Sequence, residues 1–487
     1  MTSSTAAKMG KRRVFISADH GLAIVYFLQS DLVDRLIVAG VEVVLLSDDG
    51  LIEQIQQRFG RPGLVVEGLR LSQAENYFKT VSPFWQWWLD FLRRAGASRR
   101  INLEAVESYI QQVEAEANPR RKRLFPLMQI VVAALRNLRW ARQLLVRAQR
   151  RFTPNLYADL FAKYQPELVV ASTPGWRHDR YLLREAAARG VPTAAVIVGW
   201  DNSSSYSLPG APVDWISCWS ELQKEELTQG SDWDAKRVHV GGIPSYDGYF
   251  RDEWRLPRQQ YFAQHGLDPQ RKLISYASSF ITFSPNIQNI EALAELVSGQ
   301  QLAEPSQLLI RLHPNHFMDV ERFAAEREQI RALAQRFPHV HLVEPVPLGG
   351  SLGYYSGEDM PEKASMMAYS DVFVTVYSTM VVEASVQGSP VVSACIDSPL
   401  GWPGKFTLPL SRIGDWPTHS RFRQSGAGRV AYIAAELAAA INHYLQNPQA
   451  DQAARAAFVQ RECTFTDGSA GQRTADYLLS RIGKQDE

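Results

Sequence analysis

The chain has 487 residues, of which 45% are hydrophobic, and its 52 Lys and Arg nearly balance its 51 Asp and Glu. This length predicts two or three domains of ~100–200 residues, each with its own core. The near-zero net charge argues against a dedicated nucleic-acid-binding protein, which is usually basic overall. The three cysteines are too few and too far apart for a disulfide scaffold or a paired-cysteine zinc site, so we expect a reducing compartment.

The sequence shows neither a membrane-spanning pattern nor a secretion signal. No apolar stretch reaches the ~18–20 residues that a membrane-spanning helix needs. Met1–Arg13 is basic, but it runs into a strand pattern without the apolar core of a signal peptide. We therefore expect a cytoplasmic protein that is either soluble or attached to a membrane surface.

The first half of the chain alternates short apolar runs with helical patterns. The runs are Val14–Ser17, Val41–Ser47, Leu168–Ser172, Thr193–Val198 and Trp215–Cys218. An amphipathic helix is expected over Leu22–Ala39. Short β-branched runs that alternate with helices are typical of a parallel sheet covered on both faces.

A second series of the same kind follows. Its runs are Leu273–Ala277, Leu308–Leu312, His339–Val343, Val372–Val376 and Pro390–Ser393. We therefore predict an α/β protein with two Rossmann-like parallel-sheet domains, over residues 1–250 and 251–487, facing a common cleft. The last helical pattern, Gly471–Ile482, is expected to cross back to the first domain.

Residues 75–152 form an aromatic and basic insertion in the first series. The insertion contains Trp85, Trp87 and Trp88 and a basic stripe of Arg136, Arg139 and Arg142. Arg120–Arg151 has ten Lys or Arg and no Asp or Glu, and Leu124–Leu145 has apolar residues at helical spacing. This composition predicts a helix on the anionic inner face of the cytoplasmic membrane. The alternative is a helix packed on its own domain with a solvated arginine face.

Ligands of parallel sheets bind beyond the carboxyl ends of the strands, so the residues just after the apolar runs are the candidate site. Asp19, His20 and Gly21 follow the first run. Neutral imidazole at His20 is a suitable general base for a hydroxyl, and Gly21 lets a ligand approach the backbone. Alternatively, His20 caps the following helix.

Two further groups follow strands of the first half. Asp48-Asp49-Gly50 offers Asp49 as a carboxylate base, although Asp-Gly is also ordinary turn chemistry. Trp200, Asp201 and Asn202 begin a serine-rich loop after Thr193–Val198. Hydrogen-bonding groups beside an aromatic ring suit the hydroxyls of an acceptor, and a plain surface loop is the alternative.

In the second half, polar candidates gather after three runs. These are Ser278 and Ser279, then Arg311, His313 and Pro314, and then Ser378, Thr379 and Glu383. Hydroxyls and backbone N–H groups at a helix start bind anions, and a carboxylate one turn later can accept from ribose hydroxyls. The alternative for each group is a capped helix or a strand ended by proline.

Several common motifs are missing from the sequence. There is no P-loop, no strand-linked GxGxxG, no HExxH and no GxSxG nucleophile elbow. ATP hydrolysis, a dinucleotide redox cofactor and a serine hydrolase are therefore not supported. We expect no cofactor and no metal site.

Three segments of the second half resemble the C-terminal domain of GT-B glycosyltransferases. They are Tyr276–Phe280, Arg311–Pro314 and Tyr377–Thr379, the last with Glu383-Ala384. They are most similar to the bacterial surface-polysaccharide group that includes CDP-glycerol glycerophosphotransferases and the His-Pro-motif sialyl- and Kdo-transferases. Trp200–Asn202, Trp219–Lys224 and Gly241–Asp247 resemble the end of the N-terminal domain. The resemblance covers about residues 165–480 and leaves the insertion unmatched.

The resemblance implies that His313, Pro314, Ser378 and Thr379 hold the donor nucleotide and its phosphates. The expected activity is metal-independent transfer of a sugar from a nucleotide-activated donor to a glycan or lipid-linked acceptor. His20, or else Asp19, Asp49 or Asp201, is the expected base, and Gly21, Trp200 and Asn202 are expected to contact the acceptor. The alternatives are a CDP-glycerol or polyol-phosphate transferase, a sugar-nucleotide 2-epimerase and an inactive GT-B binding protein.

Overall fold

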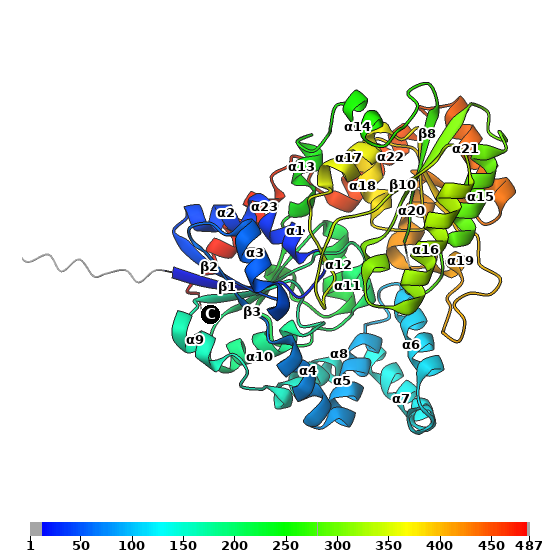
Figure 1. The fold of residues 1–487 in the computed structure, drawn as a ribbon. Coiled ribbons are helices and arrows are strands. Elements are labelled where there is room, and N and C mark those ends of the chain that lie inside the picture. Colours follow the sequence, from blue (N-terminus) through cyan, green and yellow to red (C-terminus); the bar gives the residue numbers. More distant parts are fainter. Residues whose placement is uncertain (1–11, 280, 485–487) are drawn as a thin grey trace, which may run out of the picture.

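The computed structural model describes residues 12–279 and 281–484. Within these residues the chain forms a seven-stranded and a six-stranded sheet, both fully parallel. The two sheets belong to two domains, which Figure 1 shows at lower left and upper right. The predicted α/β class with two parallel-sheet domains is confirmed.

The first domain is built on the sheet β3-β2-β1-β4-β5-β6-β7. Its strands are β1 (Arg12–Ser17), β2 (Val41–Ser47), β3 (Leu64–Gly68), β4 (Leu168–Ala171), β5 (Thr193–Val196), β6 (Trp215–Cys218) and β7 (Val238–Val240). Its helices outside the insertion are α1 (Ala23–Leu28), α2 (Asp31–Val38), α3 (Ile52–Phe59), α4 (Leu71–Thr80), α9 (Ala158–Tyr164), α10 (Asp179–Ala188), α11 (Asn202–Ser205), α12 (Glu221–Gly230) and α13 (Asp247–Phe250).

The second domain is built on the sheet β10-β9-β8-β13-β14-β15. Its strands are β8 (Lys272–Ala277), β9 (Ser306–Arg311), β10 (Val340–Val343), β13 (Val372–Thr375), β14 (Val391–Ala394) and β15 (Gly428–Ala431), and β11 (Pro347–Gly349) pairs with β12 (Tyr354–Tyr355) in a separate hairpin. Its helices are α14 (Arg258–Gln264), α15 (Ile287–Ser298), α16 (Glu321–Arg336), α17 (Met360–Tyr369), α18 (Met380–Val386), α19 (Leu410–Ile413), α20 (Pro417–Ser425), α21 (Ala434–Gln446) and α22 (Gln452–Cys463). The last helix, α23 (Ala470–Leu479), packs in the core of the first domain.

Both sheets reverse their strand order beside their first strand. In the first sheet β1 lies between β2 and β4, and in the second sheet β8 lies between β9 and β13. Such switch points create a crevice at the carboxyl ends of the strands, because the connections on either side run in opposite directions. The loops after β1, β4, β8 and β13 are therefore the natural place for a ligand.

The expected single helix over Leu22–Ala39 is wrong in detail, because the chain forms two helices there. All six residues of α1 are buried, so this helix is not amphipathic. Ser30 then starts α2 by accepting a hydrogen bond from the Leu32 N–H, which satisfies one of the free donors of the new helix. The break turns α2 so that it packs against α23, and Figure 1 shows the two side by side.

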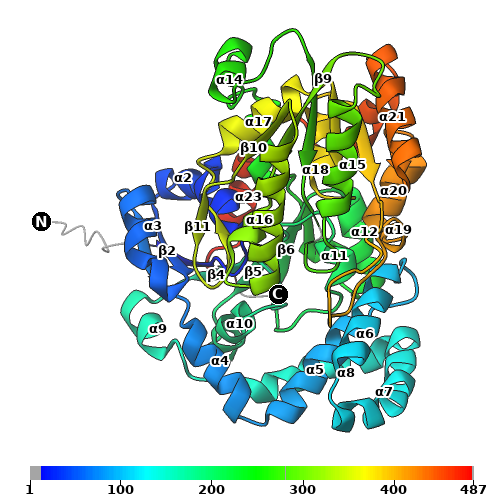
Figure 2. The same cartoon turned by 45° about the vertical axis from the view of Figure 1, so that its right-hand side comes forward.

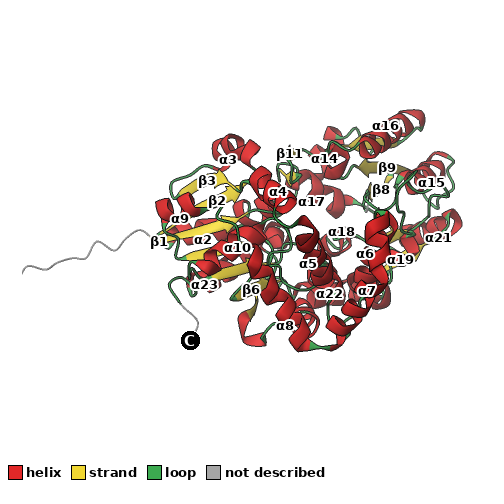
Figure 3. Ribbon diagram, turned by 90° about the horizontal axis from the view of Figure 1, so that it is seen from below, coloured by secondary structure: helices red, strands yellow, loops and turns green. Residues whose placement is uncertain are grey.

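The insertion folds into its own helical layer. Its helices are α5 (Pro83–Ala95), α6 (Glu104–Glu116), α7 (Pro119–Asn137) and α8 (Arg139–Ala148). Trp88, Phe91, Phe125 and Leu135 form its small apolar core. Figure 2 shows this layer below the sheets, and Figure 3 shows it from below. No helix of the described chain is both long and apolar enough to cross a membrane.

The predicted basic stripe on this layer is wrong for two of its three arginines. The helix expected over Leu124–Leu145 is broken at the extended residue Leu138, so the spacing of three no longer keeps the arginines on one face. Arg136 pairs with Glu107 at 2.5 Å, and Arg142 pairs with Asp232 at 2.7 Å. Both guanidinium groups point into the domain.

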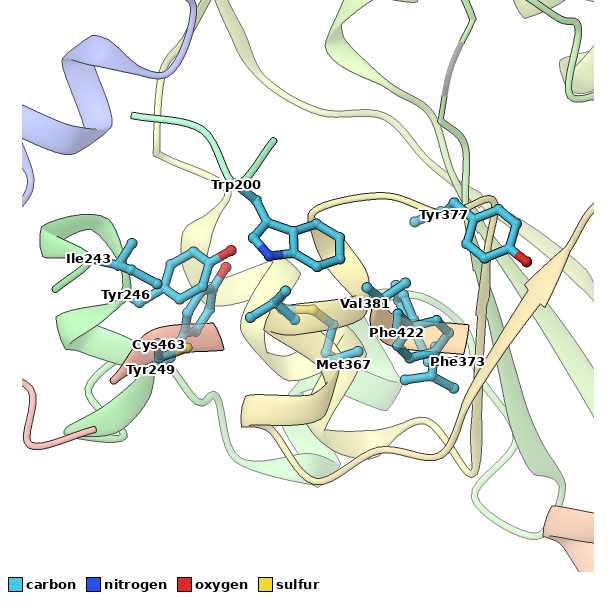
Figure 4. Packing of buried hydrophobic residues seen from close by; sticks show 14 of the residues in the cluster. Trp200, Ile243, Tyr246, Tyr249, Met367, Phe373, Tyr377, Val381, Phe422 and Cys463 are labelled. Atoms are coloured by element: carbon cyan, nitrogen blue, oxygen red, sulfur yellow. The ribbon is translucent and has the colours of Figure 1, made fainter. Parts of the chain in front are cut away.

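The interface between the domains is apolar and continuous. A single hydrophobic cluster contains side chains of both domains, and Figure 4 shows Trp200, Tyr246 and Tyr249 of the first domain with Met367 and Tyr377 of the second. A shared apolar core of this kind holds two domains in one arrangement more firmly than a polar interface does. The cleft between the sheets is therefore a defined structural feature.

Candidate active site

A pocket in the cleft lies at the carboxyl ends of both sheets. Leu22, Val198 and Tyr246 of the first domain and Ala277 and Leu312 of the second are among its wall residues. A second hollow adjoins it and shares the wall residues His313, Ser378 and Thr379. The hollows measure about 140 and 210 Å³, so together they lie at the lower end of the range of small-molecule sites, ~300–1,000 Å³.

Ser378 and Thr379 stand at the centre of this site, where β13 ends. Before them, Tyr377 has a backbone φ of 20°, which is unusual for a residue other than glycine. The Ser378 hydroxyl accepts a hydrogen bond from the Met380 N–H at 3.3 Å, as a capping residue does. Both residues nevertheless line the pocket and the hollow, so the predicted capping and binding roles are compatible.

His313 follows β9 and borders both spaces, together with Pro314 in the first. Its Nδ1 accepts a hydrogen bond from the Asn315 N–H at 3.1 Å, so the ring proton is on Nε2, 3.4 Å from the Tyr355 hydroxyl. Burial, with smaller contributions from His316, Lys363 and Arg311, lowers the pKa of His313 to about 3. At neutral pH the imidazole is therefore an uncharged hydrogen-bond donor.

The two serines after β8 line different spaces, one the pocket and the other the adjoining hollow. Ser278 lines the pocket, and its hydroxyl donates to the Arg311 carbonyl at 3.0 Å. Ser279 lines the hollow, and its N–H donates to the Asn286 side chain at 3.0 Å. Both are buried, so their main observed role is to fix the loop at the strand exit.

Arg311 lies in the pocket wall, but its charge is already engaged. Its guanidinium forms ion pairs with Asp359 and Glu362, at the start of α17. These partners are 48 and 51 residues away in the chain. Arg311 therefore ties β9 to α17 instead of presenting a free cation to the pocket.

A second cation of the pocket, Lys363, was not predicted from the sequence. Lys363 on α17 lines the pocket, and its Nζ is 2.5 Å from Glu383 Oε2. The Tyr249 hydroxyl donates to the same oxygen at 2.7 Å. Lys363 lies inside a helix and not after a strand, so a search of strand exits could not find it; no other pattern marks it.

The second hollow is lined by the serine-rich loop after β5. Trp200 and Asp201 border it, and Trp200 donates its indole N–H to Glu462 at 2.8 Å. Asp201 accepts a hydrogen bond from the Ser205 hydroxyl at 3.2 Å, and burial raises the pKa of its carboxyl group. Asn202 is buried behind the loop, where its side chain lies against Gly199. Of the four candidate bases, Asp201 is the one among the lining residues of the two spaces.

The residues after β1 are placed differently from the expectation. His20 Nδ1 accepts a hydrogen bond from the Leu22 N–H at 3.1 Å, in the turn that precedes α1. Burial and the positive charge of Arg177 lower the pKa of His20 to about 3, so its imidazole is a weak base. Asp19 is fully buried and accepts a hydrogen bond from the Asp179 N–H at 2.7 Å.

Gly21 and Asp49 serve contacts within the protein. The Gly21 carbonyl accepts from the Tyr355 N–H at 2.9 Å, and a side chain at position 21 would collide with the backbone of Gly353. Gly21 therefore allows the two domains to approach each other. Asp49 accepts hydrogen bonds from the Arg70 and Leu71 N–H groups at the start of α4, so its carboxylate stabilises a turn and a helix end.

Metal ligands were not expected from the sequence. In the residues that the structure describes, no three His, Cys, Asp or Glu side chains are grouped so that they could hold a metal ion. Two cations, Arg311 and Lys363, and two carboxylates, Asp359 and Glu383, line the pocket. The neutral His313 and the hydroxyls of Ser378 and Thr379 add hydrogen-bond donors that can bind an anion.

Comparisons with known proteins identify the fold. No family model and no curated protein matches the sequence. The UDP-GlcNAc 2-epimerase of Neisseria meningitidis bound to UDP-GlcNAc is 12% identical, with a TM-score of 0.51 over 96% of this chain and 99% of that chain. A glycosyltransferase from Rickettsia africae is 10% identical, with a TM-score of 0.52 over 98% and 100%. An Anabaena protein in complex with UDP and glucose is 12% identical, with a TM-score of 0.50 over 96% and 100%.

These similarities extend over both domains of the chain. Sequence identities this low support a shared fold but not a shared function. They agree with the two parallel sheets, the shared cleft and the resemblance seen in the second half of the sequence. The protein has the GT-B fold.

Proposed function

We propose that the protein is an enzyme that acts on a nucleotide-activated sugar bound in the cleft. The observation that carries this proposal is the convergence of Lys363, His313, Ser378 and Thr379 on one pocket that both domains line. These groups offer a cation and neutral hydrogen-bond donors to a diphosphate. The solved structures with UDP-GlcNAc and with UDP and glucose support the same class of ligand.

Each pocket residue has a role that its present contacts support. Lys363 is paired with Glu383 beside the pocket, and we infer that its ammonium group leaves this pair to bind a phosphate. Glu383 would then be free to accept from ribose hydroxyls while it keeps the hydrogen bond from Tyr249. Neutral His313 donates from Nε2 without changing its charge, which stabilises negative charge on a leaving phosphate.

The chemistry would take place in the adjoining hollow, next to Asp201. A carboxyl group with a raised pKa is a stronger base than an ordinary aspartate once it is ionised, so it suits proton transfer near neutral pH. In glycosyl transfer, Asp201 would deprotonate an acceptor hydroxyl that attacks the anomeric carbon. The nucleotide diphosphate leaves, and the pocket donors stabilise its charge.

A 2-epimerase is the second candidate, and the comparisons favour it. The Neisseria meningitidis protein, which shares the fold over both domains, is a UDP-GlcNAc 2-epimerase. Inversion at C2 requires a proton to leave one face of the sugar and to return to the other. Asp201 is the one carboxyl group among the described lining residues of the hollow, which suits a single proton transfer better than two. Transfer of a polyol phosphate would use the same pocket with attack at phosphorus.

One experiment separates these reactions. The protein is incubated in D2O with UDP-GlcNAc, and the sugar is followed by NMR. An epimerase gives the C2 epimer with deuterium at C2, because the C–H bond is broken and remade in solvent. A transferase leaves C2 protonated and releases UDP only when an acceptor is added. A protein that neither binds nor turns over UDP-, GDP-, CMP- or CDP-linked donors would contradict the proposal.

A further inference from the structure

The helical insertion exposes large apolar side chains on its outer surface. They are Phe84 and Trp85 on α5, Leu127 and Ile130 on α7, and Trp140 and Leu144 on α8. Ile130 is 68% and Trp140 is 64% exposed, values far above those of packed side chains. Single exposed apolar residues are common, but six on neighbouring helices of one layer mark an interaction surface.

The same helices carry positive charge that the protein does not neutralise. The exposed basic residues are Arg120, Lys122 and Arg123 at the start of α7 and Arg147, Arg150 and Arg151 at the end of α8 and just beyond it. None of these six takes part in an ion pair with another described residue, whereas Arg136 and Arg142, on the inner side, both do. The nearest acidic residues in the sequence are Glu114 and Glu116 at the end of α6.

Domain packing explains the inner face of this layer but not its outer face. Trp88, Phe91 and Phe125 fill the core of the layer, and Arg136 and Arg142 hold it to its neighbours. The six apolar and six basic residues above are all exposed, so none of them belongs to that core. We call these twelve residues the docking face. Aromatic rings and long aliphatic chains beside uncompensated cations match the headgroup layer of an anionic bilayer.

We propose that the docking face binds the surface of an anionic lipid bilayer. The basic residues attract the anionic headgroups, and the apolar residues enter the boundary between headgroups and acyl chains. No helix of the described chain could cross the bilayer, so the layer lies on its surface. The proposal does not depend on which reaction the cleft performs.

The docking helices are connected to the hollow that contains Asp201. Arg93 of α5 donates to the carbonyl groups of Tyr206 and Leu208 at 2.9 and 3.0 Å, and Arg94 donates to the Ser205 carbonyl at 3.2 Å. These carbonyl groups follow Asp201 in the same loop. The bilayer would therefore lie on the helices that hold the loop bordering the site.

The test is co-sedimentation of the full chain with vesicles of phosphatidylcholine alone or of equal parts phosphatidylcholine and phosphatidylglycerol. We expect binding to the mixed vesicles at least about tenfold stronger than to phosphatidylcholine, and reduced by salt. Replacing Arg120, Lys122, Arg123 and Arg147 with Gln should remove most of this binding. I130S combined with W140S should weaken it without any change in charge.

A control variant distinguishes the effect of charge on the docking face from the effect of the protein's net charge. Lys236, Arg258, Lys405 and Arg461 are also exposed and basic, and replacing these four with Gln removes the same charge from outside the docking face. Its binding should stay within about twofold of the unmodified protein. The proposal would be overturned if both four-residue variants lost vesicle binding equally. It would also be overturned if the protein bound both kinds of vesicle equally or bound neither. Dimers in solution that I130S and W140S dissociate, with no vesicle binding, would make the face a self-association surface.

Discussion

Arg421 is expected to be the residue whose removal most weakens the contact between the domains. It lies on α20 and pairs with Glu226 of the first domain at 2.7 Å and with Glu462 of α22 at 2.8 Å. The side chains of Glu226 and Glu462 are only 9% and 1% exposed. Arg421→Met would leave two buried carboxyl groups without their cation. Removing one partner of a buried ion pair typically destabilises a protein by ~3–5 kcal/mol.

The effect of Arg421→Met should depend on pH. Burial already raises the pKa of Glu226 while Arg421 opposes the shift. Without the arginine, the folded-state pKa rises further above the unfolded value of ~4.3. Stability is then lost as the pH rises through that range, because the unfolded state releases the proton first. The destabilisation should be largest near about pH 8 and smaller near about pH 5.

Urea unfolding followed by the fluorescence of the 12 tryptophans measures this effect. Arg423→Met is the matched control, since Arg423 is on the same helix but is 36% exposed and pairs with an exposed Asp415. That variant should lose ~0–1 kcal/mol. Equal losses in the two variants, or a loss in Arg421→Met that does not change between the two pH values, would refute the reasoning.

Three further predictions concern the site. Asp201→Asn should lower kcat by ~10²–10⁴ with nucleotide affinity retained, measured by steady-state turnover and calorimetry; normal turnover would remove Asp201 as the base. Lys363→Gln should weaken UDP binding by about tenfold or more, because it removes a charge-assisted contact of ~1.5–3 kcal/mol. Lys236 is exposed and lies outside the pocket, so Lys236→Gln should bind UDP normally. The pKa of His313 is about 3 in the folded protein and ~6.5 in the unfolded chain, so its contribution to folding is lost as the pH falls below ~6.5. The stability difference between the unmodified protein and His313→Gln should therefore shrink by ~1.4 kcal/mol per pH unit below that point, and a constant difference would contradict a neutral imidazole in the folded protein.

The sequence predicts the architecture well because parallel strands leave a strong local signal. Runs such as Val41–Ser47 and Val372–Val376 are apolar because helices cover both faces of the sheet, and they appear as β2 and β13. The rule that ligands bind at strand exits then places His313, Ser378 and Thr379 in the cleft. Three strands at sheet edges, β3, β7 and β15, are not among the predicted runs.

What the sequence does not predict depends on contacts between distant segments. Trp200 and Glu462 are 262 residues apart and meet only because α22 packs on the first domain. Lys363 reaches the pocket from inside α17, and the choice of Asp201 over Asp49 depends on which carboxylate is left free of helix capping. Such differences are settled by tertiary packing, which leaves no spacing pattern in the sequence.

The cleft is proposed to bind a nucleotide sugar through the second domain. The most direct test is a thermal-shift titration of the unmodified protein and His313→Ala with UDP-, GDP-, CMP- and CDP-linked sugars. A ligand that binds only the folded state adds ~2.7 kcal/mol of stability at ~100-fold excess over its Kd. We expect at least one donor to raise the Tm of the unmodified protein, and we expect a much smaller shift for His313→Ala, measured from that variant's own Tm without ligand. No shift with any donor, or equal shifts in both proteins, would contradict this proposal.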